Sequence, residues 1–485
     1  MPEDAADNAR LGEALRRLIP ALEEFNRFEG PDPTVTHKDR WLSAIDTPLP
    51  QLGQGLDAVV ETLATSVVPY GLRMGAPGFN GWVTGQPTTS GTVAALAQTV
   101  AGPQRFFYHP FNVLEEVRLR WIAQMLGIPG DLQGAFKSGG SIANIVGLAA
   151  ARQRAFERIG IDAAAKGLPP GYRGRIYAST EVHHVISRAA ALLGLGRDCV
   201  TAVGCDEHQR IDLTALKETL LEGARAGAVP IAIVATAGTV NTGAVDPISE
   251  MSEIAAERDL WFHVDGAYGL FARLDDRVAH LFNGVERADS VAVDPHKWMA
   301  TPVGCGAAYV RDADLLHRTF TLQPAAYLEG AVGSATQPLQ SPWDVFAGEH
   351  HNLSLEQSAP PRGVQVWAVL KEIGVRGLRA RVDRHLDFAR RLADRVRVDD
   401  RLQLLSEPTL SICCFRYFRE DLDDTELDAL NDEIVRSLHD GARFIPSTTR
   451  VHGRLAIRPC YINPRTTEAE VEGLVDAVIE IGSKL

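Results

Sequence analysis

The sequence predicts an α/β protein: a large domain with a mostly parallel sheet, followed by a smaller α+β domain. The first observation is a series of short apolar runs that alternate with helical stretches, at 175–178, 230–236, 260–264, 290–293 and 306–310. Such alternation is typical of parallel strands joined by crossover helices. The second observation is length, because 485 residues exceed what one hydrophobic core usually holds. We therefore expect at least two domains.

Two helices are expected ahead of the large domain. Leucines at helical spacing predict an amphipathic helix over residues 8–27: Leu11, Leu15, Leu18 and Leu22. Prolines punctuate the chain after it, and a second apolar helix is expected over residues 55–67. A short helical segment of this kind cannot bury its own apolar face. We therefore expect residues 1–85 to pack on another surface, ahead of a large domain over residues 86–369.

The chain from residue 370 to 485 is expected to form the small domain. Residues 409–415 are mostly apolar and predict a strand. Leucine and isoleucine recur on one face of the helix that follows, and Gly441 is expected to end it. Thr467 and Glu470 have the spacing of a capping box, which predicts the start of a last helix.

The composition excludes some classes of partner. A net charge of −13 argues against binding to nucleic acid or to an anionic membrane. No apolar run is long enough to span a bilayer, and the acidic N-terminus lacks the order of a signal peptide. Six cysteines without CxxC spacing predict reduced, mostly buried thiols in a cytoplasmic protein. We expect no metal site.

A lysine follows the apolar run 290–293, in the segment Asp294-Pro295-His296-Lys297-Trp298. Lysine is rare in this chain, with seven against forty-two arginines, so Lys297 among apolar residues is notable. Burial lowers the pKa of an amine because it penalises the charged form. A neutral amine attacks aldehydes, which is the chemistry of Schiff-base enzymes. The alternative is a surface lysine after an edge strand.

An acid ends the apolar run 260–264 and is followed by small residues. Asp265 should therefore lie at the C-terminal end of a strand, where open α/β sheets bind ligands. A carboxylate there could keep the pyridine nitrogen of pyridoxal phosphate (PLP) protonated, and Ala267 is small enough for a flat ring to lie against it. The alternative is that Asp265 caps the next helix.

Two further segments suit such a cofactor. Residues 138–144 read as a glycine turn that opens a helix and so points backbone N–H groups at an anion, although many such turns are ordinary helix starts. His183 follows the strand-like residues 175–178 and could stack on a cofactor ring. A histidine in such a place is also often a hydrogen-bonded structural residue.

Taken together, these segments resemble the PLP-dependent group II amino-acid decarboxylases, from about residue 60 to the C-terminus. The matching segments are 138–144, His183, 236–239, 263–267, 290–298, 454–458 and 463–467. The resemblance implies PLP-dependent transferase fold type I, with a seven-stranded-type, mostly parallel sheet. It also implies a homodimer, in which the N-terminal helical segment wraps around the partner subunit, and decarboxylation of an amino acid.

The resemblance assigns roles to individual residues. Lys297 would hold the cofactor, Asp265 would pair with the pyridine nitrogen, and His183 would stack above the ring. The phosphate would be gripped by Gly140, Ser141 and Ser290, with support from His296. The cofactor-binding residues implied in this way are Ser138, Gly139, Gly140, Ser141, His183, Thr239, Asp265, Ala267, Ser290, His296 and Lys297.

Substrate contacts are less determined. Arg458 is a candidate for orienting the substrate carboxylate, because guanidinium makes bidentate pairs; the alternative is a structural ion pair in the small domain. Phe79, Trp82 and Phe106 lie where the resembled family lines its side-chain pocket, which favours an aromatic or apolar substrate. Arginines near these segments keep an acidic substrate open.

One departure from the resembled family concerns a loop tyrosine that helps to protonate the carbanion after carbon dioxide leaves. Residues 330–362 contain no tyrosine. His350 or His351 could supply the proton instead, because the pKa of histidine is near neutral. Alternatively these histidines are ordinary loop residues, and a longer-lived carbanion meets dioxygen.

Three functions therefore stay open. The first is an L-amino-acid α-decarboxylase that releases an amine. The second keeps PLP but ends in an aldehyde, as in aldehyde synthases, or breaks a carbon–carbon bond as a lyase. The third is a catalytically silent relative that acts as a binding partner, against which the intact Lys297 and Asp265 argue.

Overall fold

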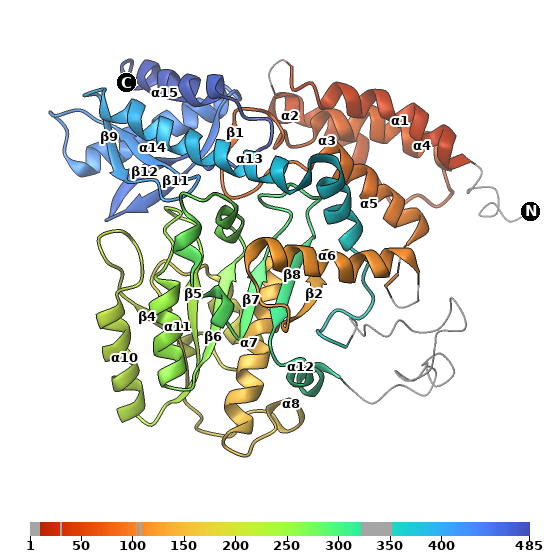
Figure 1. Ribbon diagram of the computed structural model, residues 1–485. Helices are drawn as coiled ribbons and strands as arrows, with labels where there is room; N and C mark the ends of the chain where they lie inside the picture. Colours follow the sequence, from red (N-terminus) through yellow and green to blue (C-terminus); the bar gives the residue numbers. More distant parts are fainter. Residues whose placement is uncertain (1–9, 30–31, 103, 106–108, 322–351) are drawn as a thin grey trace, which may run out of the picture.

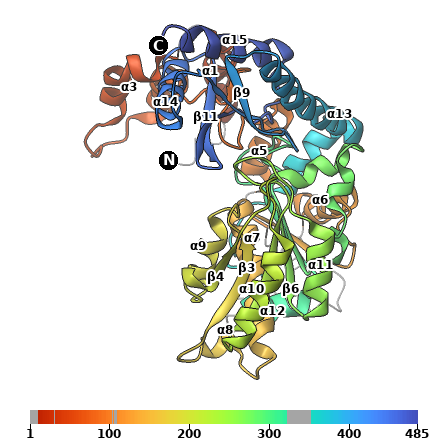
Figure 2. The same ribbon diagram turned by 90° about the vertical axis from the view of Figure 1, so that its left-hand side faces the viewer.

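The computed structural model describes residues 10–29, 32–102, 104–105, 109–321 and 352–485. Figures 1 and 2 show a large sheet flanked by helices, with the small domain and the N-terminal helices lying together above it. No helix in the described part of the chain has the length and apolar character needed to cross a membrane.

The large domain is built on a seven-stranded sheet in the order β2-β8-β7-β6-β5-β3-β4. The strands are β2 (Gln133–Lys137), β3 (Gly174–Ser179), β4 (Val200–Val203), β5 (Val229–Thr236), β6 (Trp261–Gly266), β7 (Ser290–Val293) and β8 (Gly306–Val310). β3 to β7 pair in parallel, while β8 runs antiparallel to both β7 and β2. The mostly parallel sheet and the five apolar strands that the sequence predicts are confirmed.

Helices bury both faces of this sheet, which explains why its strands read as nearly continuous apolar runs. On β6, Phe262 and Val264 pack into one cluster with α6 and α11, whereas Trp261 packs into another with α7 and α9. The helices are α5 (Thr89–Ala101), α6 (Pro110–Leu126), α7 (Gly140–Glu157), α8 (Ala163–Lys166), α9 (Val185–Leu192), α10 (Leu213–Arg225), α11 (Ile248–Glu257) and α12 (Ala313–Phe320).

The small domain packs helices against a five-stranded sheet in the order β1-β11-β12-β10-β9. Its strands are β1 (Phe79–Asn80), β9 (Leu402–Ser406), β10 (Cys414–Tyr417), β11 (Ile445–Val451) and β12 (Arg454–Arg458). Its helices are α14 (Asp424–Asp440) and α15 (Glu468–Gly482), which begins at the predicted capping box. β1 comes from the N-terminal segment and pairs in parallel with β11.

The strand predicted over residues 409–415 is wrong in its bounds, because β10 begins only at Cys414. The preceding residues bond to other parts of the chain. The backbone N–H of Ser411 donates to the Tyr268 hydroxyl at 3.2 Å, and its carbonyl accepts from the N–H of Tyr461 at 2.8 Å. The first bond ties the segment to the large domain, and the second accompanies an isolated antiparallel bridge between Ile412 and Cys460, so among the described residues the segment pairs with the chain only at this one point before β10 begins.

α13 (Gly363–Arg397) joins the two domains and kinks at Gly374, whose φ of +65° is unfavourable for residues with a side chain. It packs against α5 and α6 before the kink and against α15 after it. Residue 370, where the sequence places the domain boundary, lies inside this helix, close to the kink. The three domain ranges stay predictions.

Both predicted N-terminal helices form, and residues 8 and 9 of the first lie outside the described residues. The segment consists of α1 (Leu11–Phe25), α2 (Pro33–Thr36), α3 (Lys38–Ile45) and α4 (Gly55–Thr62), which continues as a π-helix over Leu63–Val67. None of the α1 side chains is buried. Leu49 and Leu52 expose more than four fifths of their surface.

A buried charged cluster holds the strand that leads into the glycine turn. Lys137 and Glu115 are fully buried, and Lys137 Nζ donates to Ser354 Oγ at 3.0 Å. Burial lowers the pKa of Lys137 to about 7, with Arg105 acting in the same direction. Burial also raises the pKa of Glu115 to about 7, against the opposing effect of Arg105 and Arg362. The folded chain therefore resists charge at both positions.

We expect Lys137→Met to stabilise the protein at acidic pH. Below a pH of about 7 the folded state must hold a charged amine in a buried site, whereas lysine becomes neutral in both states above 10.5. The penalty that methionine removes is therefore greatest below pH 7 and shrinks as the pH rises. The expected gain in the free energy of unfolding is about 1–2 kcal/mol at pH 6.

Thermal unfolding at pH 6 and pH 9 measures this effect. Lys217→Met on exposed α10 is the control. A lower melting temperature of Lys137→Met at pH 6 would mean that the buried charge holds the cluster together.

Candidate active site

The C-terminal ends of β5, β6 and β7 meet at one edge of the large sheet. Thr236 and Asp265 are register partners there, and Asp294 directly follows β7. A cavity of about 330 Å³ opens at this edge, facing the start of α7. Nine of the residues proposed from the sequence line it: Ser138, Gly139, Gly140, Ser141, His183, Asp265, Ala267, His296 and Lys297.

The glycine turn is required by close packing. Gly139 has a φ of +144°, which residues with a side chain rarely adopt. A Cβ atom on Gly140 would lie 2.9 Å from Asp294 Oδ2 and 3.0 Å from the Ala267 Cβ. α7 therefore begins against the cavity wall, with its first backbone N–H groups pointing toward the strand ends. This is the geometry that binds an anion such as a phosphate.

A relay of hydrogen bonds fixes the first turn of α7 on the sheet. Trp261 Nε1 can only donate, and it bonds Ser290 Oγ at 2.7 Å. Ser290 Oγ then donates to His263 Nδ1 at 2.7 Å, and His263 Nε2 donates to Asn144 Oδ1 at 2.7 Å. Asn144 Nδ2 donates to the Gly140 carbonyl at 2.9 Å. Burial lowers the pKa of His263 to about 4, which suits the neutral ring that this relay requires.

The proposed phosphate contact of Ser290 is therefore corrected. Ser290 opens β7, at the opposite end of the strand from Lys297, and does not line the cavity. Its hydroxyl is used by the relay. Ser290 supports α7 from behind.

Thr239 is likewise corrected, and Thr236 takes its place. Thr239 is fully buried, and its hydroxyl bonds Thr242 Oγ1 and the N–H of Ala244, both at 3.1 Å. Thr236 lines the cavity, and its buried hydroxyl has no hydrogen-bond partner in the described part of the chain. Its position at a strand end beside Asp265 is the signal that would have identified it.

Lys297 and Asp265 both reach the cavity. Lys297 keeps about 20% of its side chain exposed, and its Nζ lies 3.8 Å from Asp294 Oδ2. Asp265 is buried, and Oδ1 accepts the N–H of Ala267 at 3.1 Å. The alternative that Asp265 only caps a helix is wrong, because Asp265 precedes no α-helix directly and lines the cavity.

His183 lies at the cavity wall, where its surroundings favour the neutral ring. Burial lowers its pKa, and the nearby Lys297 acts in the same direction, while Asp265 opposes both. Its Nδ1 accepts the N–H of Val185 at 3.3 Å, so the remaining proton lies on Nε2. His183 can therefore present one N–H to the site.

Asp294 is a site residue that the sequence reasoning missed. Oδ2 accepts the backbone N–H of Gly140 at 3.0 Å, and Oδ1 lies 2.7 Å from His296 Nδ1. Only about 3% of the side chain is exposed. A carboxylate directly after an apolar strand was the signal used for Asp265, and it applies equally here.

The proposed substrate residues lie elsewhere. Arg458 is buried and donates to the carbonyls of Val240, Asn241 and Trp82, and to Ser447 Oγ. Its donors are thus engaged by the protein, so its assignment to a substrate carboxylate is corrected to a structural clamp.

Trp82, one of the aromatic candidates, has a φ of +52° and exposes 57% of its surface. It lines a separate hollow of about 360 Å³ that shares Val240 with the first cavity. Phe79 is buried in the small sheet and does not line the cavity. Phe106, His350 and His351 lie outside the described residues.

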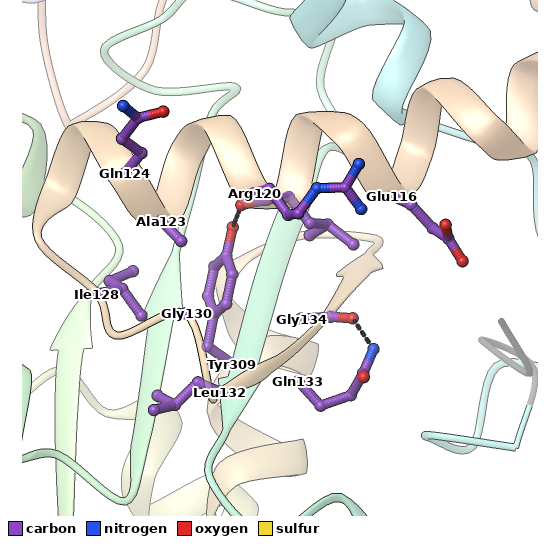
Figure 3. A pocket seen from close by; sticks show the side chains of 11 residues that line it. Glu116, Arg120, Ala123, Gln124, Ile128, Gly130, Leu132, Gln133, Gly134 and Tyr309 are labelled. Carbon is purple, nitrogen blue, oxygen red and sulfur yellow. Dashed lines mark hydrogen bonds between the residues drawn. The ribbon is translucent and has the colours of Figure 1, made fainter.

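A larger hollow of about 480 Å³ lies between α6 and the edge strand β2 (Figure 3). Its polar groups are largely those of the helix surface, including Glu116, Arg120 and Gln124. On its floor the Tyr309 hydroxyl donates to the Leu119 carbonyl at 2.8 Å. None of the strand-end residues reaches it, so the smaller cavity is the candidate active site.

Comparison with known proteins identifies the family of the chain. The family described as "Pyridoxal-dependent decarboxylase conserved domain" matches residues 45–418, and the chain belongs to it. An aromatic-L-amino-acid decarboxylase of Bacillus atrophaeus is 31% identical over 74% of this chain and 70% of its own length. An L-2,4-diaminobutyrate decarboxylase of Rhizobium meliloti is 29% identical over 90% of this chain and 84% of its own length.

The crystal structure of mouse CSAD shares the fold with a TM-score of 0.87 and 23% identity, covering 98% of this chain and all of that one. The architecture is that of PLP-dependent transferase fold type I. The chain is therefore a PLP-dependent amino-acid decarboxylase, a carboxy-lyase, and PLP is its cofactor.

The residues present fit that cofactor. The cavity offers an amine in Lys297, a buried carboxylate in Asp265, and a buried hydroxyl without a partner in Thr236. The start of α7 supplies the anion-binding end. All six cysteines are free of disulfide bonds in the structure and five of them are buried, as predicted for their burial.

Proposed function

We propose that this enzyme decarboxylates an L-amino acid with an aromatic or apolar side chain and releases the amine. The observation that carries the proposal is the joint placement of Lys297, Asp265 and His183 around one cavity at the start of α7. The aromatic preference is supported by the relative from Bacillus atrophaeus.

When bound, PLP supplies an electron sink for the charge left on the substrate Cα. The protein supplies the rest. Lys297 provides the amine that holds the cofactor, and Asp265 holds a proton on the pyridine nitrogen. Gly140 and Ser141, as the first residues of α7, would bind the phosphate through backbone N–H groups, of which that of Gly140 also donates to Asp294. His183 offers its Nε2 proton to the site.

The enzyme is proposed to act as a homodimer. α5 exposes Val93, Leu96 and Val100, which are spaced so that they lie on one helical face. Leu49 and Leu52 are further large apolar side chains of the N-terminal part that are exposed among the described residues. A second copy is the partner that the N-terminal segment was expected to need.

The free cysteines favour the reducing cytoplasm as the location of the enzyme.

A second outcome of the same site is an aldehyde. Residues 330–362 contain no tyrosine to protonate the carbanion. If His350 or His351 supplies that proton, the product is an amine. If neither does, dioxygen takes the two electrons and water releases the product, so that one amino acid, one dioxygen and one water give an aldehyde, carbon dioxide, ammonia and hydrogen peroxide. A carbon–carbon lyase on the same scaffold is a further alternative.

Mass-spectrometric product analysis tests these proposals. The PLP-loaded enzyme is incubated under air with L-tryptophan, L-tyrosine, L-phenylalanine, L-glutamate and L-2,4-diaminobutyrate, with each D-isomer as the matched control. We expect an amine from an aromatic substrate at a rate at least about tenfold above the others, which corresponds to about 1.4 kcal/mol of discrimination. Turnover of diaminobutyrate or glutamate alone would refute the aromatic preference. Aldehyde with an equal amount of peroxide would establish the second outcome.

A further inference from the structure

The helix end that should bind the phosphate of PLP already holds an anion of the protein. Asp294 Oδ2 accepts the N–H of Gly140, the first residue of α7, at 3.0 Å. The carboxylate is buried, so it is not a surface group that solvent screens. A single backbone N–H group donates one well-aligned hydrogen bond, so it cannot bind the carboxylate and a phosphate equally well at the same time.

We propose that Asp294 is a built-in competitor of the cofactor phosphate, which weakens the grip of the site on PLP and makes the cofactor exchangeable. This inference rests on the assignment of the α7 terminus as the phosphate site. It concerns how tightly the chain holds PLP, a property separate from which amino acid it decarboxylates.

Few other donors at the helix end remain for a phosphate. The N–H of Ala143 donates to the Gly139 carbonyl at 3.1 Å, so only Gly140, Ser141 and Ile142 begin the helix without a bond to the preceding chain. Asp294 takes the first of these three. A phosphate that approaches α7 must displace the carboxylate or use only the two remaining backbone donors of the helix end, together with side-chain hydroxyls such as that of Thr236.

Charges around Asp294 set how strongly this competition acts. His296 Nδ1 lies 2.7 Å from Oδ1, and Lys297 Nζ lies 3.8 Å from Oδ2. Asp265 lines the same cavity and adds a second negative group. The two carboxylates face two cationic or potentially cationic side chains. A phosphate with a charge near −2 therefore meets a site whose positive charge is already matched.

The opposite role is also chemically possible and predicts the opposite result. If Asp294 serves to orient His296 as a charged partner of the phosphate, then removing the carboxylate weakens PLP binding. If Asp294 competes with the phosphate, removing it tightens binding. The sign of the change in affinity therefore separates the two roles.

The test uses a Lys297→Ala background, which removes the covalent link and leaves the non-covalent affinity to be measured by calorimetric titration. Three probes are titrated: PLP, inorganic phosphate and pyridoxal, which lacks the phosphate. Asp294→Asn removes the charge, and Asp294→Ala also frees the Gly140 N–H. Asp289→Asn is the matched control, because Asp289 precedes the same strand at its other end and bonds the N–H of Phe262.

We expect both Asp294 variants to bind PLP and inorganic phosphate about tenfold more tightly, as loss of a close like-charge contact predicts. Pyridoxal affinity should change less than twofold, and Asp289→Asn should change none of the three. In the background that keeps Lys297, the Asp294→Asn enzyme should also retain more bound PLP than the wild type after gel filtration. The visible absorbance of the cofactor measures this retention.

Weaker or unchanged binding of PLP in both variants would overturn the proposal, as would equal tightening of pyridoxal. Circular dichroism establishes that each variant is folded. If one Asp294 variant does not fold, the comparison is made with the other one. The Lys297→Ala protein could bind PLP no more tightly than pyridoxal and fail to bind inorganic phosphate. In that case the assignment of the phosphate site to α7 fails, and this inference fails with it. The substrate proposal is judged separately by the product analysis.

Discussion

Lys297→Ala is expected to lose both the visible absorbance of bound cofactor and at least about a thousandfold of the turnover rate. Lys297 is the lysine that lines the cavity among the described residues, together with Asp265, and about 20% of its side chain is exposed. Without it, the described part of the cavity lining holds no other lysine to bind the aldehyde of PLP. The substrate would then have to react with PLP that is bound only by non-covalent contacts.

Absorbance and product formation should be measured on the same preparation, after gel filtration to remove loose PLP. Lys371→Ala on the exposed face of α13 is the control and should keep both signals. Wild-type turnover in Lys297→Ala would contradict the assignment of Lys297. Loss of turnover with normal cofactor absorbance would show instead that another group holds PLP.

Asp265→Asn is expected to lower turnover by about 10²–10³-fold while PLP remains bound. The carboxylate is buried at the end of β6, where it can hold a proton on the pyridine nitrogen. Asparagine has nearly the same shape but no charge, so the ring would withdraw electrons less strongly. Because Lys297 and α7 are untouched, cofactor binding should persist.

Cofactor content by absorbance and the single-turnover rate with the preferred amino acid separate these two effects. Asp131→Asn, at an exposed residue that precedes β2, is the control. A variant that turns over within threefold of the wild type would remove Asp265 from the chemistry. A variant without cofactor would instead assign Asp265 to binding.

Much of the fold and the centre of the site could be predicted because they depend on local patterns. Lys297 and Asp265 each follow an apolar run, and parallel strands bring such ends to one edge. The glycine turn likewise precedes a long apolar helix. These features need no knowledge of what lies across the sheet.

The rest depended on contacts that no local pattern specifies. Ser290 and Asp294 flank the same short strand, and only the strand direction places Asp294 in the cavity and Ser290 in the relay behind it. Thr236 and Thr239 are three residues apart, yet a turn separates their environments. The sequence left a substrate role open for Arg458, because the carbonyl groups that its guanidinium contacts belong to segments far away along the chain.

The pairing of β1 with β11 has a consequence for how the chain folds as it is made. Phe79 lies early in the sequence, whereas its partner Ile445 lies near the end. During synthesis the first strand therefore waits, without its neighbour, until nearly the whole chain has left the ribosome. Completion of the C-terminal sheet closes this long-range contact, which is slow to form because the loop is long. Truncated chains that lack β11 would leave the N-terminal strand unpaired, a ready substrate for chaperones and proteases.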